Sequence, residues 1–125
     1  MTLDIRALPL TRGQLDIWLA QETGHSGTEW QLGLFVRIEG TVERGALEWA
    51  IRRALQEAEP VRAAFFEMDG QVFQRAIDYP DVEVAFFDVS DSRHPVQEAR
   101  GIALSIQSTP MPSAGPLFKF ALIQT

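Results

Sequence analysis

The sequence predicts an α+β fold in which a mixed β-sheet is flanked by helices, and three observations carry that prediction. Stretches with apolar residues at helical spacing alternate with stretches that are apolar at every second residue. Asp69-Gly70 separates two apolar runs, which is the strongest short-range signal for a β-hairpin. Residues 117–123 are apolar except for Lys119, as expected of a central strand that is covered on both faces.

The first half of the chain predicts one helix and one strand. Thr11 is a suitable N-cap residue, and Leu15, Trp18 and Leu19 follow at the spacing of one helical face. We expect Trp18 to pack in the core against the second helix. Every second position of residues 30–38 is apolar, which predicts a strand with one buried face.

The second helix is predicted over residues 43–57, where Glu48 and Arg52 form an i, i+4 pair of favourable order. Pro60 closes this helix. The hairpin follows, with strands at 62–68 and 71–77.

Beyond the hairpin, the pattern predicts a strand, a helix and a final strand. Residues 82–86 alternate again and form a short strand. Asp91 or Ser92 can cap the helix that follows, with Pro95 in its first turn. The apolar run at 117–123 is the last strand.

Composition excludes several classes of function. The chain has 125 residues, enough for one domain with a core, and a net charge of −6, which argues against binding nucleic acid. It contains no cysteine, so disulfides, thiolate metal sites and a cysteine nucleophile are excluded. There is no signal peptide and no stretch long enough to span a membrane, so we expect a cytoplasmic protein that does not bind membranes.

No complete catalytic or metal site is visible in the sequence. His25 and His94 lie in separate predicted loops without a nearby Ser or acidic partner, and exposed loop histidines are the better interpretation. Glu83, Asp88 and Asp91 gather around a strand end, but capping of the next helix already explains Asp91. We therefore expect no metal ion and assign no catalytic residue.

Two stretches carry a resemblance to a known family. Residues 8–18 match the pattern Pro-Leu-Ser-x-x-Gln-x-x-x-Trp, with Thr11 in place of Ser. The matching residues are Pro9, Leu10, Gln14 and Trp18. This pattern resembles the opening motif of the condensation domains of nonribosomal peptide synthetases.

The second motif of that family is roughly Arg-His-Glu-x-Leu-Arg-Thr-x-Phe, and it aligns with residues 57–65. Glu59, Arg62 and Phe65 match, whereas Glu57 and Ala58 stand where the family has Arg and His. Two further positions depart from the motif, Val61 for Leu and Ala63 for Thr. The stretches at 66–74 and 116–120 are similar to the family's hairpin and to the strand that precedes its catalytic loop.

The resemblance implies one lobe of the two-lobed fold of chloramphenicol acetyltransferase. It implies a parent enzyme that forms amide bonds between an acyl donor and an aminoacyl acceptor on carrier proteins, in siderophore biosynthesis. The substrates are carried on phosphopantetheine, and no cofactor binds this chain directly. The implied partners are carrier proteins and the second lobe. Gln14, Trp18 and Arg62 are implied to be scaffold residues near the cleft.

The family's active-site motif, His-His-x-x-x-Asp-Gly, occurs nowhere in the 125 residues. We therefore expect residues 1–125 to be the N-terminal lobe, truncated before that motif and inactive alone. We also expect the parent gene to continue past Thr125 and to open a synthetase module, and the isolated lobe to self-associate through its apolar last strand. Two alternatives stay open: a related acyltransferase that depends on coenzyme A or carrier proteins, and a non-catalytic interaction module.

Overall fold

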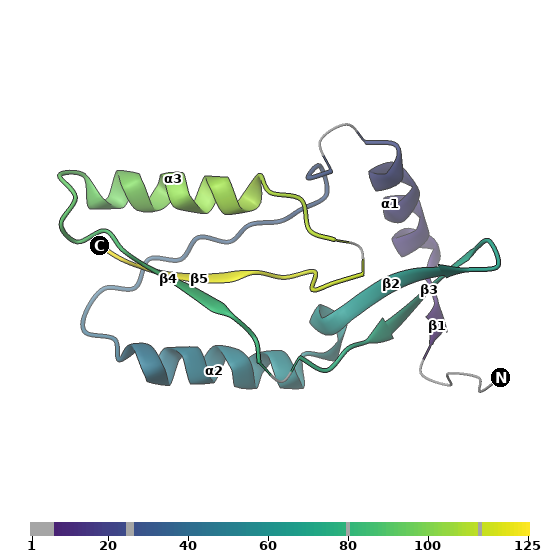
Figure 1. Ribbon diagram of the computed structural model, residues 1–125, viewed down its shortest axis with the longest axis horizontal. Helices are drawn as coiled ribbons and strands as arrows, with labels where there is room; N and C mark the ends of the chain where they lie inside the picture. The colour runs from purple at the N-terminus through teal and green to yellow at the C-terminus, as the bar shows by residue number, and fades with distance from the viewer. Residues whose placement is uncertain (1–6, 25–26, 80, 113) are drawn as a thin grey trace.

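The structure, a computed structural model, describes residues 7–24, 27–79, 81–112 and 114–125 (Figure 1). The helices of these residues are α1 (Arg12–Glu22), α2 (Arg44–Glu57) and α3 (Pro95–Gln107), with a short 3-10 turn at Glu59–Arg62. The strands are β1 (Leu8–Pro9), β2 (Ala63–Met68), β3 (Gln71–Ala76), β4 (Val84–Asp88) and β5 (Phe120–Gln124). The predicted α+β class is therefore confirmed.

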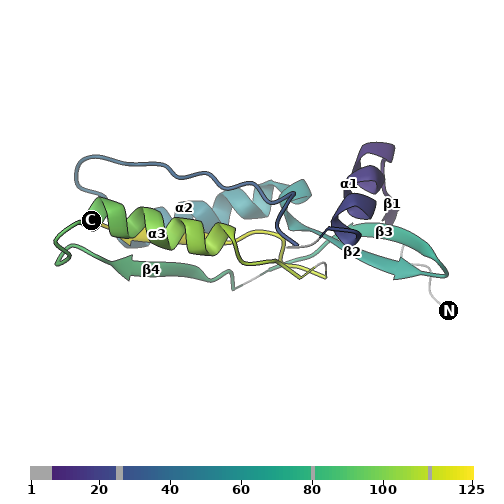
Figure 2. The same cartoon turned by 90° about the horizontal axis from the view of Figure 1, so that it is seen from above.

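The strands of the described residues lie in two sheets, one antiparallel and one parallel. One sheet has the order β1-β3-β2 and is antiparallel throughout. The other contains β4 and β5, which are parallel and are connected through α3. Helix α1 packs against the antiparallel sheet at one end of the molecule, and β4 and β5 lie between α2 and α3 (Figures 1 and 2).

Capping interactions fix the starts of the first two helices. The Thr11 hydroxyl accepts from the Gln14 backbone N–H at 3.2 Å, and the Gln14 side chain accepts from the Thr11 N–H at 2.9 Å. Two orphan donors at the start of α1 are thereby satisfied. At the start of α2 the Glu43 carboxylate accepts from the N–H groups of Gly45 and Ala46, at 3.1 and 2.6 Å. Both predicted helices are confirmed.

The hairpin turn is of the type that its sequence predicts. Asp69 and Gly70 both have positive φ, 54° and 76°, as a type I′ turn requires. The two-residue loop pairs Met68 with Gln71, and the register then runs without a bulge to Ala63 opposite Ala76. The hairpin is therefore aligned residue by residue from its turn.

The core of the described residues is small and lies mainly where α2 and α3 meet the strands. Its buried apolar residues are Leu55, Ala64, Val82, Val84, Val89 and Ala99. Two arginines of α2 contact residues outside the helix. The Arg52 Nε donates to the Val82 carbonyl at 3.1 Å, and the Arg44 guanidinium lies 3.7 Å from the centre of the Phe86 ring. These contacts tie α2 to the strand β4 and the segment that leads into it.

The strand predicted at residues 30–38 is wrong for this structure. After Trp30 the segment is extended but forms no ladder, and Leu32 and Leu34 are 97% and 90% exposed. A strand needs a neighbour to satisfy its backbone groups, and none of the described strands pairs with this segment. Alternation therefore predicted the extended conformation but not the pairing.

The starts of α3 and of the last strand differ from the prediction, and the short strand β1 was not predicted. Helix α3 begins at Pro95 with His94 as N-cap, so neither Asp91 nor Ser92 caps it. Proline at the first helical position sets φ and needs no partner for an N–H, which accounts for this start. The Ser92 hydroxyl instead accepts from the His94 N–H at 3.2 Å. The last strand starts at Phe120, later than predicted, and β1 is too short to give a periodic signal.

The turn conformation makes a testable prediction about two glycines. Gly70→Ala places a side chain at φ 76° and should lower the free energy of unfolding by about 1–2 kcal/mol. Gly101→Ala is the matched control, because Gly101 lies inside α3 with open space around its Cα and should stabilise by about 0.5–1 kcal/mol. Urea denaturation measures both, and equal effects of the two variants would contradict the assigned turn.

Candidate functional site: the motif residues at the hairpin

Gln14 joins the first helix to the hairpin through a reciprocal pair of amide hydrogen bonds. Its Nε2 donates to Gln74 Oε1 at 3.1 Å, and Gln74 Nε2 donates back to Gln14 Oε1 at 2.9 Å. Gln74 Nε2 also lies 3.3 Å from the carbonyl of Pro9, in β1. The same Gln14 oxygen serves the capping box of α1, so one side chain fixes both the start of the helix and its seat on β3.

Trp18 lies one helical turn after Gln14 and contacts the other strand of the hairpin. Its ring centre is 5.8 Å from that of Phe65, and the ring planes are inclined by 57°. Phe65 is the register partner of Gln74, so Gln14 and Trp18 meet two residues that face each other across the hairpin. Trp18 is half-buried. The ring partner is thus on β2, where we had expected the helix α2.

Arg62 lies at the base of the hairpin and is buried, with 9% of its surface exposed. Its Nε donates to the Leu55 carbonyl at 3.1 Å and Nη2 to the Gln56 carbonyl at 3.4 Å, both near the end of α2. Nη1 donates to the Ile77 carbonyl at 3.0 Å and to Asp78 Oδ1 at 3.2 Å. The planar guanidinium therefore ties the end of α2 to the segment after β3.

The charged side chains described next, Arg62, Asp78 and Asp88, have structural roles. The Arg62–Asp78 ion pair has one buried and one exposed member, because the Asp78 side chain is 86% exposed, so solvent weakens the attraction. Elsewhere, hydrogen bonds from the Ser90 hydroxyl and Ser90 N–H lower the pKa of Asp88 at the end of β4. These two bonds form a local turn that needs no ligand to explain it.

The described residues hold no group of three or more His, Asp or Glu side chains placed to bind a metal ion. His94 is exposed, as expected for a loop histidine, and His25 lies outside the described residues. None of the helices in the described part of the chain has the length and apolarity that crossing a bilayer requires.

One hollow of about 400 Å³ lies where the C-terminal end of α3 meets the start of β4 and the loop before β5. Tyr79 and Phe118 meet there edge to face, with ring centres 5.3 Å apart. Asp81, Glu83 and Lys119 supply the charges of its lining. Gln14, Trp18 and Arg62 do not line it, so the motif residues and this hollow are separate features.

Two partners of the motif residues, Gln74 and Asp78, were not predicted from the sequence. A signal for Gln74 was present, because a two-residue loop at Asp69-Gly70 fixes the register and places Gln74 opposite Phe65. For Asp78 there was no such signal, since its contact depends on the path of the chain after β3.

Comparison with known proteins gives one family throughout. The family model for the condensation domain matches residues 5–125. A dimodular nonribosomal peptide synthase of Bacillus subtilis is 31% identical over 115 residues, which are 90% of this chain and 5% of that protein. Enterobactin synthase component F of Shigella flexneri is 28% identical over 120 residues, 94% of this chain and 9% of that protein.

Solved condensation domains share the fold. The starter condensation domain of rhizomide synthetase, in complex with C8-CoA, superimposes with a TM-score of 0.86 at 28% identity, over 94% of this chain and 28% of that chain. The first condensation domain of the calcium-dependent antibiotic synthetase gives 0.84 at 24% identity, over 94% and 29% of the two chains, and supports the fold alone. The chain thus spans less than a third of these structures.

The contacts of Arg62 predict which of its interactions matter. Arg62→Met should lower the free energy of unfolding by about 3 kcal/mol, because it leaves buried carbonyls without donors. Arg62→Lys should be nearly as damaging, since an ammonium lacks the planar fork. Asp78→Asn, the control, should cost below about 0.5 kcal/mol. If chemical denaturation shows Asp78→Asn to be as damaging as Arg62→Met, the ion pair is the important interaction instead.

Proposed function

Because the chain belongs to the condensation-domain family of nonribosomal peptide synthetases, we propose that residues 1–125 form the N-terminal lobe of such a domain. The family match at residues 5–125 is the observation that carries the proposal. The reaction is the joining of an acyl donor to an aminoacyl acceptor, with each substrate held as a thioester on the phosphopantetheine arm of a carrier protein. The amine of the acceptor attacks the donor's thioester carbon, a C–N bond forms, and the C–S bond breaks to release a thiol.

The described residues contribute to this reaction by holding the lobe in shape. Gln14 and Trp18 seat α1 on the hairpin, and Arg62 fixes the hairpin to α2. Two tethered substrates react quickly only when their reacting atoms are held together, so a rigid lobe supplies part of the rate. The proton transfers belong to the family's His-His-x-x-x-Asp-Gly motif, which these 125 residues lack. We propose that this motif and a second lobe follow residues 1–125 in the working enzyme.

Its partners are then a donor carrier protein, an acceptor carrier protein and the second lobe. The likeness to enterobactin synthase component F supports a role in making a siderophore. That role depends on the substrates that the enzyme accepts.

One observation favours a second kind of donor. The rhizomide synthetase domain that superimposes on this chain is a starter condensation domain and was solved with C8-CoA. A fatty acyl group that arrives on coenzyme A has the same thioester and the same phosphopantetheine arm as one that arrives on a carrier protein. The alternative is therefore an enzyme that acylates the first amino acid of a peptide from an acyl coenzyme A.

Two polypeptides test the proposal: residues 1–125 alone, and the same chain extended by what its gene encodes through a second lobe. Each is incubated with an aminoacyl carrier protein and with either an acyl carrier protein or octanoyl-CoA, and amide is measured by mass spectrometry. We expect amide from the extended polypeptide and none above the no-protein control from residues 1–125. The donor that yields amide decides between the two donor classes.

Amide formed by residues 1–125 alone would contradict the assignment of catalysis to the missing motif. An extended polypeptide that is folded but makes no amide from either donor would contradict the proposed reaction.

A further inference from the structure

The hollow of about 400 Å³ beside the parallel sheet has one wall that a single side chain holds in place. Thr109 and Met111 belong to this wall. Gln31 Nε2 donates to the Thr109 carbonyl at 3.1 Å, and Gln31 Oε1 accepts from the Met111 N–H at 3.0 Å. The same Nε2 also donates to the Gln107 carbonyl, at the end of α3, at 2.9 Å. This wall is therefore formed before a ligand arrives, and the volume lies in the range of small-molecule sites, about 300–1,000 Å³.

Three aromatic rings form a second wall of the hollow. The Tyr79 and Phe118 rings meet edge to face at 5.3 Å, and the Phe118 and Phe120 ring centres are 5.5 Å apart. The Gln56 side chain donates to the Tyr79 carbonyl at 3.1 Å and so fixes the position of the first ring. Another aromatic ring can pack against such a wall in the same edge-to-face or offset geometry.

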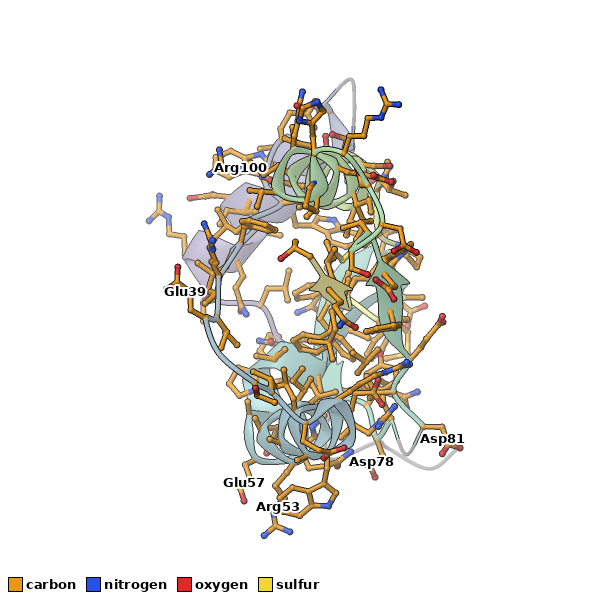
Figure 3. The ribbon with its side chains drawn as sticks, turned by 90° about the vertical axis from the view of Figure 1, so that its left-hand side faces the viewer. Glu39, Arg53, Glu57, Asp78, Asp81 and Arg100 are labelled. Atoms are coloured by element: carbon orange, nitrogen blue, oxygen red, sulfur yellow. The ribbon has the colours of Figure 1, made fainter. Side chains whose placement is uncertain are left out.

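Two side chains of opposite charge, Glu83 and Lys119, lie side by side in the lining of the hollow. Strands β4 and β5 are parallel with Val84 opposite Phe120, and Glu83 and Lys119 directly precede these two residues. Paired strands lie about 4.8 Å apart, yet Glu83 and Lys119 form no ion pair with each other or with any other residue that the structure describes. Asp81 also belongs to the lining, but it lies at the outer edge of the molecule (Figure 3), so we assign the negative group of the site to Glu83.

A ligand for this hollow needs a positive group for Glu83, a negative group close by for Lys119, and a flat apolar body for the rings. A free aromatic α-amino acid has all three, because its ammonium and carboxylate are attached to one carbon atom that also carries the ring-bearing side chain. We propose that the hollow binds such an amino acid, with the ammonium at Glu83, the carboxylate at Lys119 and the ring against Tyr79 and Phe118.

This ligand differs from both substrates of the proposed reaction. In an acyl or aminoacyl thioester the carboxyl group is bonded to sulfur and carries no negative charge that Lys119 could bind. The hollow is thus a site for the free amino acid, not for the tethered one. The inference does not rest on the proposed function, because binding is measured in the absence of carrier proteins and of any acyl donor.

Isothermal titration calorimetry of the extended polypeptide with four ligands tests the proposal. They are L-phenylalanine, L-phenylalaninamide, N-acetyl-L-phenylalanine and glycine. We expect phenylalanine to bind saturably at one site. The amide lacks the carboxylate and the N-acetyl compound lacks the ammonium, so each loses one ionic hydrogen bond and should bind at least roughly tenfold more weakly. Glycine lacks the ring and should also bind at least roughly tenfold more weakly.

Two variants locate the site, Lys119→Met and Glu83→Gln. Both side chains are exposed, so the melting temperature of the protein without ligand should not change. Each variant should weaken phenylalanine binding at least roughly tenfold. In Lys119→Met, phenylalanine and its amide should bind equally, because the carboxylate has lost its partner. In Glu83→Gln, phenylalanine and the N-acetyl compound should bind equally for the corresponding reason.

Arg100→Met and Glu98→Gln are the matched controls. They remove the same charges from exposed positions of α3, and neither residue lines the hollow. Figure 3 shows Arg100 at the opposite edge of the molecule from Asp81. Both controls should leave the dissociation constant of phenylalanine within about twofold of that of the unaltered protein.

Three results would overturn the proposal. One is the absence of saturable phenylalanine binding below about 10 mM. Another is binding that neither Lys119→Met nor Glu83→Gln weakens, which would place the amino acid elsewhere. The last is equal binding of phenylalanine and its two blocked derivatives, which would leave the two charges without a role. Amide formation is measured separately, so a failure of the proposed reaction leaves this site standing, and the reverse also holds.

Discussion

The fixed register of the β2–β3 hairpin is the constraint on which the contacts of the motif residues Gln14, Trp18 and Arg62 depend. A two-residue turn with positive φ at Asp69 and Gly70 leaves only one alignment of the strands. That alignment places Phe65 opposite Gln74, and α1 is seated by contacts to this pair. Arg62 precedes β2 and ties the base of the same hairpin to α2. A slip of one residue would move each of these partners to the opposite face of the sheet.

The contacts of Arg62 explain how the second motif can be altered without loss of its structural role. Three of its four hydrogen bonds go to main-chain carbonyls, which every residue type offers. Glu57 and Ala58, which stand where the family has Arg and His, therefore do not disturb the interaction. Family membership and the geometry agree on this point, since the retained arginine is the one whose contacts hold two elements together.

The sequence predicted those elements whose signals are local. Thr11 with Gln14, the helical stripe of α2 and the Asp69-Gly70 turn act within a few residues, and each was found where predicted. Residues 30–38 failed as a strand because pairing depends on a neighbour that periodicity does not reveal. The start of α3 was set by Pro95 rather than by the better capping side chains before it. Gln14, Trp18 and Arg62 were singled out by the resemblance to the family motifs, whereas their contact partners were revealed by the structure.

The motif residues of α1 act through the hairpin, and a double-mutant cycle between Trp18 and Phe65 tests this most directly. Free energies of unfolding are measured for Trp18→Leu, Phe65→Leu and the double variant. The ring centres of Trp18 and Phe65 are 5.8 Å apart, so the two rings interact. The double variant should therefore be more stable, by about 1 kcal/mol, than the sum of the two single effects predicts. Effects that add to within about 0.3 kcal/mol would show that α1 is not seated through this pair.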